Sequence, residues 1–250
     1  MSFKQYFVLV LGGLGISLFS QVYASAYSIS PLMLVAGNND KIMEFRLTNT
    51  SDKSVPVQIQ VKKWSQKDNR DIYVKTFDLL TTPMKVELQP KKTQYFRISV
   101  VVPNHSVDMK AYRLFVRELP TPLVKQRKSS KNIASLQSDT AKLNVLLDIS
   151  IPVLLQPKVP LKEAFTWHYD RLKNNQYRVV LDNTGNSVIK LTHLNIVNHD
   201  SQSIFNKTFL QYILPKHRHS WTITLPHQPY NITAKINGET ITTQAAADRT

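Results

Sequence analysis

Apolar and polar residues alternate along most of the chain after residue 26. In Val55–Val61 every odd position is apolar, and Gln58 and Gln60 lie between them. The same period of two recurs in Lys41–Leu47 and Gln94–Val102, whereas no segment after residue 26 has a clear period of 3.6. A period of two is typical of strands that bury one face. With turn residues about every 10 positions, it predicts an all-β chain built as antiparallel sandwiches.

The strands fall into two groups. A second set of alternating runs, at Phe165–Tyr169, Tyr177–Leu181 and Trp221–Leu225, follows Pro157 and Pro160. Two prolines within four residues interrupt a strand ladder and stiffen a linker. We therefore predict two immunoglobulin-like β-sandwich domains, residues 27–157 and 158–250, each near the usual size of about 100 residues.

The first 26 residues have the pattern of an export signal. Lys4 precedes the apolar run Phe7–Phe19, and Ala24-Ser25-Ala26 provides small residues for cleavage. The apolar run has thirteen residues, fewer than the roughly 20 that a membrane-spanning helix needs. We predict a signal peptide over 1–26, with an N-terminal membrane anchor as the alternative. No later stretch is long and apolar enough to span a membrane, so no stable membrane insertion is expected.

The composition argues against several classes of function. The chain has no Cys and six Gly, three of them within the first fifteen residues, so it offers no thiolate ligand and no glycine-rich phosphate loop. His217 and His219 are flanked by Lys216 and Arg218, which would repel a metal cation. The net charge of +15 includes the lysine-rich stretch Thr121–Ala141, but that stretch lacks aromatic residues for base stacking. We expect no enzyme activity, no cofactor, no metal and no nucleic-acid partner.

The segment Leu143–Leu155 is apolar at every odd position. Thirteen residues in one phase are long compared with a usual strand of about 5–6 residues. Pro152 cannot donate a hydrogen bond to a neighbouring strand, which favours a place at the edge of a sheet. Long apolar edges pair readily with another chain. The segment is therefore either a long core strand that links two domains or a strand whose edge is offered to a partner.

Several short motifs resemble one known family. They are Thr48-Asn49-Thr50, Trp64-Ser65-Gln66, Leu79-Leu80-Thr81-Thr82-Pro83, Leu88-Gln89-Pro90, Tyr112-Arg113-Leu114-Phe115-Val116-Arg117-Glu118-Leu119-Pro120, Ile151-Pro152-Val153 and Tyr212-Ile213-Leu214-Pro215. In this order and spacing, the chain resembles the periplasmic pilus-assembly chaperones of the PapD-like superfamily, and most closely their archaic, or alternative, branch.

The resemblance implies a fold and a function. Such chaperones consist of two immunoglobulin-like domains set at an angle. In the periplasm they bind pilus or fimbrial subunits that lack a strand, complete them with a donor strand and deliver them to an outer-membrane usher. The implied donor residues here are Leu143, Val145, Leu147, Ile149, Ile151 and Val153.

The chain departs from the family at the site that holds the subunit's terminal carboxylate. Many members use an Arg on the first strand and a Lys on the donor strand, but here these positions fall near Met33 and near Ser150 or Pro152. Arg113 is the first candidate for a replacement anchor and Arg97 the second, because a guanidinium can hold a carboxylate through two hydrogen bonds. For each, a surface or interdomain salt bridge is the alternative.

Another departure concerns the contact between the domains. The Arg that many members use in an interdomain ion pair corresponds to Gln156 here, so we expect that ion pair to be missing. Other functions remain as alternatives: a secreted pilin or adhesin-like structural protein, an exported enzyme and a basic surface-binding protein.

Overall fold

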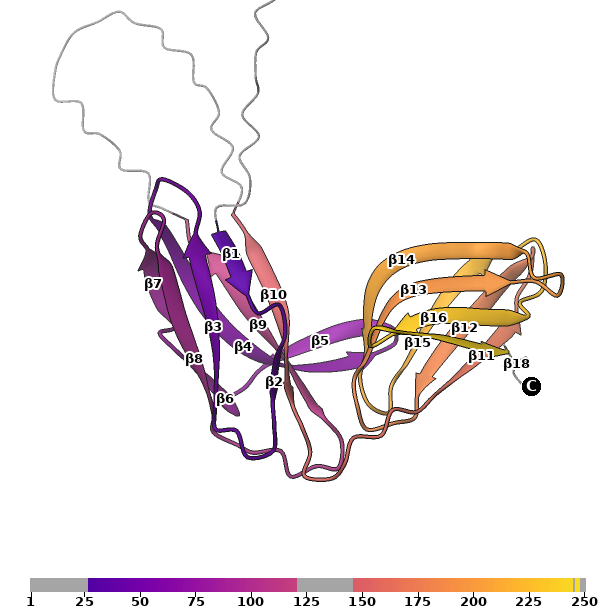
Figure 1. Cartoon of the computed structure of the whole chain (residues 1–250), viewed down its shortest axis with the longest axis horizontal. Coiled ribbons are helices and arrows are strands. Elements are labelled where there is room, and N and C mark those ends of the chain that lie inside the picture. The colour runs from indigo at the N-terminus through magenta and orange to yellow at the C-terminus, as the bar shows by residue number, and fades with distance from the viewer. Residues whose placement is uncertain (1–26, 121–145, 245, 248–250) are drawn as a thin grey trace, which may run out of the picture.

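The chain folds into two lobes of β-strands. The computed structural model describes residues 27–120, 146–244 and 246–247, and within these ranges it contains strands and no helix. Figure 1 shows the lobes inclined to one another, with strands β1–β10 in the first (the N lobe) and β11–β18 in the second (the C lobe). The prediction of an all-β protein with two sandwiches at an angle is confirmed. The expected signal peptide lies outside the described residues, which include no helix able to cross a membrane.

The N lobe is a sandwich of two sheets. The first sheet has the order β1 (Tyr27–Ser30), β3 (Ile42–Asn49), β8 (Thr93–Val100) and β6 (Leu79–Thr82). The second has the order β2 (Leu34–Ala36), β10 (Asp148–Leu155), β9 (Lys110–Glu118), β4 (Val55–Lys67) and β5 (Arg70–Lys75), and β7 (Lys85–Leu88) also pairs with β4. The alternating apolar residues meet between the sheets, where the rings of Phe45 and Phe96 stack with centroids 4.8 Å apart.

The C lobe repeats this arrangement. One sheet has the order β15 (Arg218–Thr224), β12 (Gln176–Asn183), β11 (Phe165–Arg171) and β18 (Ala246–Ala247). The other has the order β14 (Ser203–Ile213), β13 (Ile189–Val197), β16 (Asn231–Ile236) and β17 (Glu239–Gln244). Its core includes Trp167, whose ring lies 6.0 Å from that of Trp221.

A buried asparagine closes a strand end in each lobe. Asn49 ends β3 and donates from its side chain to the carbonyls of Lys53 and Leu88. Asn183 ends β12 and donates in the same way to Ser187 and Ile213. Buried carbonyls left without donors are costly. These bonds explain why the Thr48-Asn49-Thr50 motif has an amide at that place.

The β4–β5 hairpin extends from the N lobe to the C lobe (Figure 1). Its two central residues, Asp68 and Asn69, have φ of 50° and 62°. Positive φ at both positions is what a tight two-residue hairpin requires, and Asp and Asn tolerate it. At the tip, Asn69 donates to the backbone carbonyl of Ser220 and accepts from its N–H, at 3.0 Å each.

Neutral amides hold the lobes together beside an apolar cluster. The side chain of Gln66 donates to the Tyr212 carbonyl at 2.8 Å and accepts from the Leu214 N–H at 2.9 Å. The motifs at Trp64–Gln66 and Tyr212–Pro215 therefore meet at the interface, where Trp64, Met109, Ala111, Leu154, Val188, Tyr212 and Leu214 form a shared cluster. The ion pairs of the described residues each lie within one lobe.

Replacing Gln66 should loosen the interface. Gln66→Leu removes three hydrogen bonds, two of them across the interface, and leaves the Leu214 N–H without its acceptor, so the free energy of unfolding should fall by about 1–3 kcal/mol. Urea unfolding followed by tryptophan fluorescence measures this. Gln58→Leu is the control, because Gln58 lies on the same strand and its side chain bonds to no other described residue. Equal stability losses in the two variants would contradict the role given to Gln66.

Candidate functional site

Strand β10 has one side without a complete partner. It pairs antiparallel with β9 along its whole length, from Asp148 to Leu155. On its other side only Val153–Leu155 pair, in parallel, with β2. Among the described residues, no strand pairs with 148–152 on that side. Pro152, which has no N–H to donate, lies in this stretch, and the edge position expected for it agrees with the pairing.

The proposed donor residues differ in burial along β10. Ile151 and Val153 are 3% and 0% exposed and belong to the core of the N lobe. Leu147 and Ile149 are half-buried and pack against the same core from its margin. Leu143 and Val145 lie outside the described residues. The interpretation as a core strand therefore fits the C-terminal half of β10, and the unpaired stretch 148–152 extends from the exposed Asp148 to the buried Ile151 and Pro152.

Arg113 lies in a cross-strand row of cations. In the register of the sheet, Arg113 on β9 is opposite Pro152 on β10 and opposite Lys62 on β4. Lys62 is in turn opposite Lys75 on β5. Pro152 is one of the positions where the family resemblance leads one to expect a lysine, so Arg113 brings a cation to the strand next to it. Like charges on facing positions destabilise a sheet, and such a row therefore needs compensation.

Aromatic rings provide part of that compensation. The Arg113 guanidinium lies 4.1 Å from the ring centroid of Trp64 and 5.1 Å from that of Tyr212. The ammonium of Lys62 lies 5.1 Å from the Phe115 ring. Among the described residues no carboxylate pairs with Arg113 or Lys62. The buried Nε of Arg113 has no hydrogen-bond acceptor there, although the guanidinium also hydrogen-bonds to the Tyr73 side chain.

The phenols near Arg113 stay protonated at neutral pH. Burial, together with a hydrogen bond to Asp71, raises the pKa of Tyr73 to about 12, while the Arg113 charge acts in the opposite direction. Burial likewise raises the pKa of Tyr212 against the effect of Arg113. Neither ring therefore supplies an anion to neutralise the guanidinium.

The structure does not bring the second candidate anchor to this place. Arg97 lies on β8, in the other sheet of the N lobe, and its Nε is 2.9 Å from Oε1 of Glu44 on the neighbouring strand β3. Both side chains are more than half exposed. This is the surface salt bridge that the sequence left open as the alternative for Arg97.

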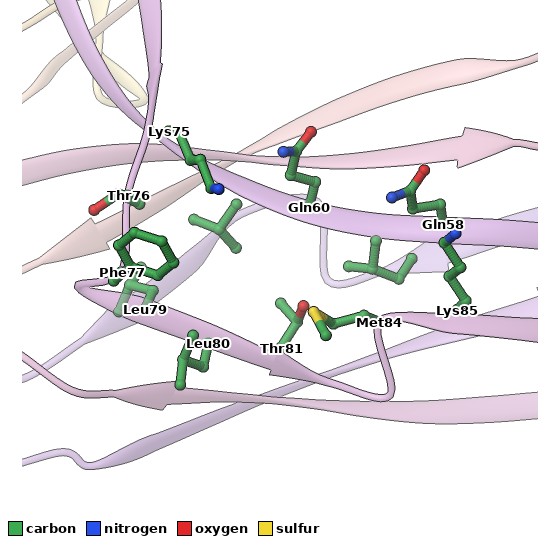
Figure 2. A pocket seen from close by; sticks show the side chains of 12 residues that line it. Gln58, Gln60, Lys75, Thr76, Phe77, Leu79, Leu80, Thr81, Met84 and Lys85 are labelled. Carbon is green, nitrogen blue, oxygen red and sulfur yellow. The ribbon is translucent and has the colours of Figure 1, made fainter.

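A groove in the N lobe was not expected from the sequence. Its volume is about 480 Å³, and it opens where β4 loses its strand partner between β5, which pairs from Lys62, and β7, which pairs up to Gln58. Figure 2 shows the amides of Gln58 and Gln60 pointing away from the apolar side chains of the groove. Three large apolar residues are exposed around it, Phe77, Leu80 and Met84. The charged residues of its lining are both lysines, Lys75 and Lys85.

Comparison with protein families identifies the class of this chain. Residues 27–160 match the family model described as the pili and flagellar-assembly chaperone, PapD N-terminal domain. The chain belongs to this family. Its members are assembly chaperones and not enzymes, so the expectation of a non-enzymatic protein is confirmed. A search of curated proteins found no match.

Solved structures with the same fold come from several bacteria. The chaperone–tip adhesion subunit complex CsuC–CsuE of the archaic Csu pili of Acinetobacter baumannii matches with a TM-score of 0.68 and 19% identity, over 90% of this chain and 100% of the other. The Salmonella enterica SafA pilin–SafB chaperone complex matches at 0.60 and 14%, over 89% and 97%. The Pseudomonas aeruginosa CupB2 chaperone matches at 0.57 and 13%, over 88% and 100%.

Two features of the site were missed by sequence reasoning. The aromatic residues beside Arg113 were present in the motifs Trp64-Ser65-Gln66 and Tyr212–Pro215, but nothing local indicates that these motifs meet. The groove is formed by residues from β4, β6 and the segments around them. The only sign of it in the sequence is the set of apolar residues Phe77, Leu80 and Met84. Such residues are equally expected in a buried core.

Proposed function

We propose that this protein is a periplasmic chaperone that holds pilus or fimbrial subunits by donor-strand complementation at the free edge of β10 and delivers them to an outer-membrane usher. The observation that carries the proposal is the unpaired side of residues 148–152 beside half-buried apolar side chains. The family provides the context, and two of the similar structures are complexes with a pilin or a tip adhesion subunit. Export through the predicted signal peptide over 1–26 would place the chain in the periplasm.

The burial along β10 limits which residues can be donated. Ile151 and Val153 are committed to the N-lobe core, so the donated side chains are Leu147 and Ile149, continued in the same period by Leu143 and Val145. Fully burying four such side chains contributes on the order of 6–12 kcal/mol before the costs of association. Main-chain hydrogen bonds along the edge add to this and are independent of the client's sequence.

Arg113 is the proposed anchor for the client's terminal carboxylate. Sliding a ladder by two residues keeps the same face inward, so a strand added to β10 needs a second contact to fix its register. A carboxylate that leaves water needs a charged partner. Arg113 supports this role because it is next to Pro152, lacks an acidic partner among the described residues and keeps a buried donor unused.

The groove is the proposed docking place for the usher. It lies on the β5 and β7 side of β4, with β9 between β4 and the free edge of β10. A client on β10 would therefore leave it open, as delivery requires. Its exposed apolar residues suit an apolar segment of the usher's periplasmic part, and Lys75 and Lys85 favour acidic residues beside that segment.

Shortening the donor side chains should abolish client capture. In Leu147→Ala/Ile149→Ala, the client loses its apolar contacts, and co-purification from cells that co-express candidate subunits should fall to background. The matched control is Val86→Ala/Val100→Ala, which trims two other partly buried residues on the same core. Both doubles should lower the melting temperature, and only the first should lose the client. Wild-type yield from the first double would contradict the assigned donor face.

Removing the guanidinium should weaken capture without unfolding the chaperone. Arg113→Ala should reduce client affinity by about 2–5 kcal/mol, as expected when one partner of a buried charge pair is truncated. Its stability should change by about 0.5–2 kcal/mol through the lost aromatic contacts. Arg97→Ala is the control and should leave affinity unchanged. A variant that loses stability but binds normally would assign Arg113 to the interface alone.

The groove can be tested separately from the donor edge. Leu80→Ser should weaken binding to the usher's periplasmic part, measured by calorimetry, and leave client capture intact. Leu210→Ser is the matched control, since Leu210 is 60% exposed on β14 and Leu80 is 47% exposed. If both variants bind the usher as the wild type does, the groove is not the docking place.

A further inference from the structure

Arg113 is enclosed by aromatic rings from both lobes. Trp64 comes from β4 in the N lobe and Tyr212 from β14 in the C lobe, and both are buried. The two rings meet edge to face, with centroids 5.7 Å apart, and the guanidinium lies close to each of them. The cation is therefore held by π-faces and by a hydrogen bond to Tyr73 rather than by an ion pair, and its Nε remains without an acceptor among the described residues.

The carboxylate of Asp71, beside this cluster, already accepts two hydrogen bonds. Asp71 accepts a hydrogen bond from the Tyr73 hydroxyl and another from the Gln66 amide, each at 2.9 Å. Two buried donors in the cluster, Arg113 Nε and Trp64 Nε1, have no acceptor among the described residues. Unsatisfied buried donors cost free energy, so the cluster favours an incoming acceptor.

The C lobe fixes the position of one wall. Gln66 holds the Tyr212 main chain through the carbonyl of Tyr212 and the N–H of Leu214. The Tyr212 ring can lie against Arg113 only when this contact between the lobes is made. The place of the guanidinium therefore depends on residues far apart in the sequence.

We infer that Trp64 and Tyr212 are positioning residues, which hold the Arg113 guanidinium ready for the client's carboxylate, so that the C lobe is part of the anchor. This rests on the proposed function of Arg113. Without a ring on one side, the long arginine side chain can adopt other rotamers. Ordering it when the client binds then costs free energy and lowers the affinity for the client. The client's carboxylate would then contribute less to the binding affinity.

The test separates carboxylate recognition from general stability. The binding partner is a fluorescein-labelled twelve-residue peptide in which valine alternates with serine, made with a free terminal carboxylate and as its terminal amide. The ratio of the two dissociation constants reports the anchor alone, and affinity for the amide form reports an intact β10 edge. Fluorescence anisotropy measures both for the wild type, Tyr212→Leu and Tyr212→Phe.

The wild type should bind the carboxylate form at least about tenfold more tightly, the range expected of a hydrogen bond to a charged group. Tyr212→Phe keeps the ring and should keep the ratio. Tyr212→Leu should bring the ratio close to one while the amide form binds as before. An unchanged ratio in Tyr212→Leu would overturn the positioning role and leave the anchor standing. A ratio of one in the wild type would overturn the anchor and the positioning role together, while binding of both peptides would still support the β10 edge.

Discussion

The unpaired side of β10 is the constraint on which the rest of the site depends. A soluble β-protein normally covers or charges such an edge, because its free N–H and C=O groups pair with any available strand. Here the short strand β2 covers only Val153–Leu155. The remaining part, beside Leu147 and Ile149, has no strand partner on that side among the described residues, and in the proposed function this side binds a client that itself lacks a strand.

In the proposed function, the cations around Arg113 complement this edge. Strand addition is strong but does not fix register, so a charged contact near one end adds specificity that the ladder lacks. The row of Arg113, Lys62 and Lys75 would be unfavourable by itself. Aromatic faces offset part of this repulsion without neutralising the charge, as the proposed anchor requires.

Local patterns predicted the strands and the two sandwiches well, because a period of two directly reflects burial of one face. The free edge at Pro152 was also accessible, since a proline cannot donate to a ladder. Contacts between distant segments were not: nothing near Trp64 indicates that it meets Tyr212, and nothing near Gln58 indicates a gap between β5 and β7. The difference in burial among the proposed donor residues could not be predicted for the same reason. Ile151 and Leu147 share one alternation, and only the fold decides which of them is buried.

Hydrogen exchange along β10 tests the central claim most directly. In the free protein, amides of residues 147–151 that point away from β9 should exchange quickly, whereas the β9 ladder protects the others. When a pilus subunit is bound, those fast amides should become protected, and amides on the outer side of β5, the opposite edge of the same sheet, should not change. Fast exchange that persists on β10 in the complex would contradict donor-strand complementation at this edge.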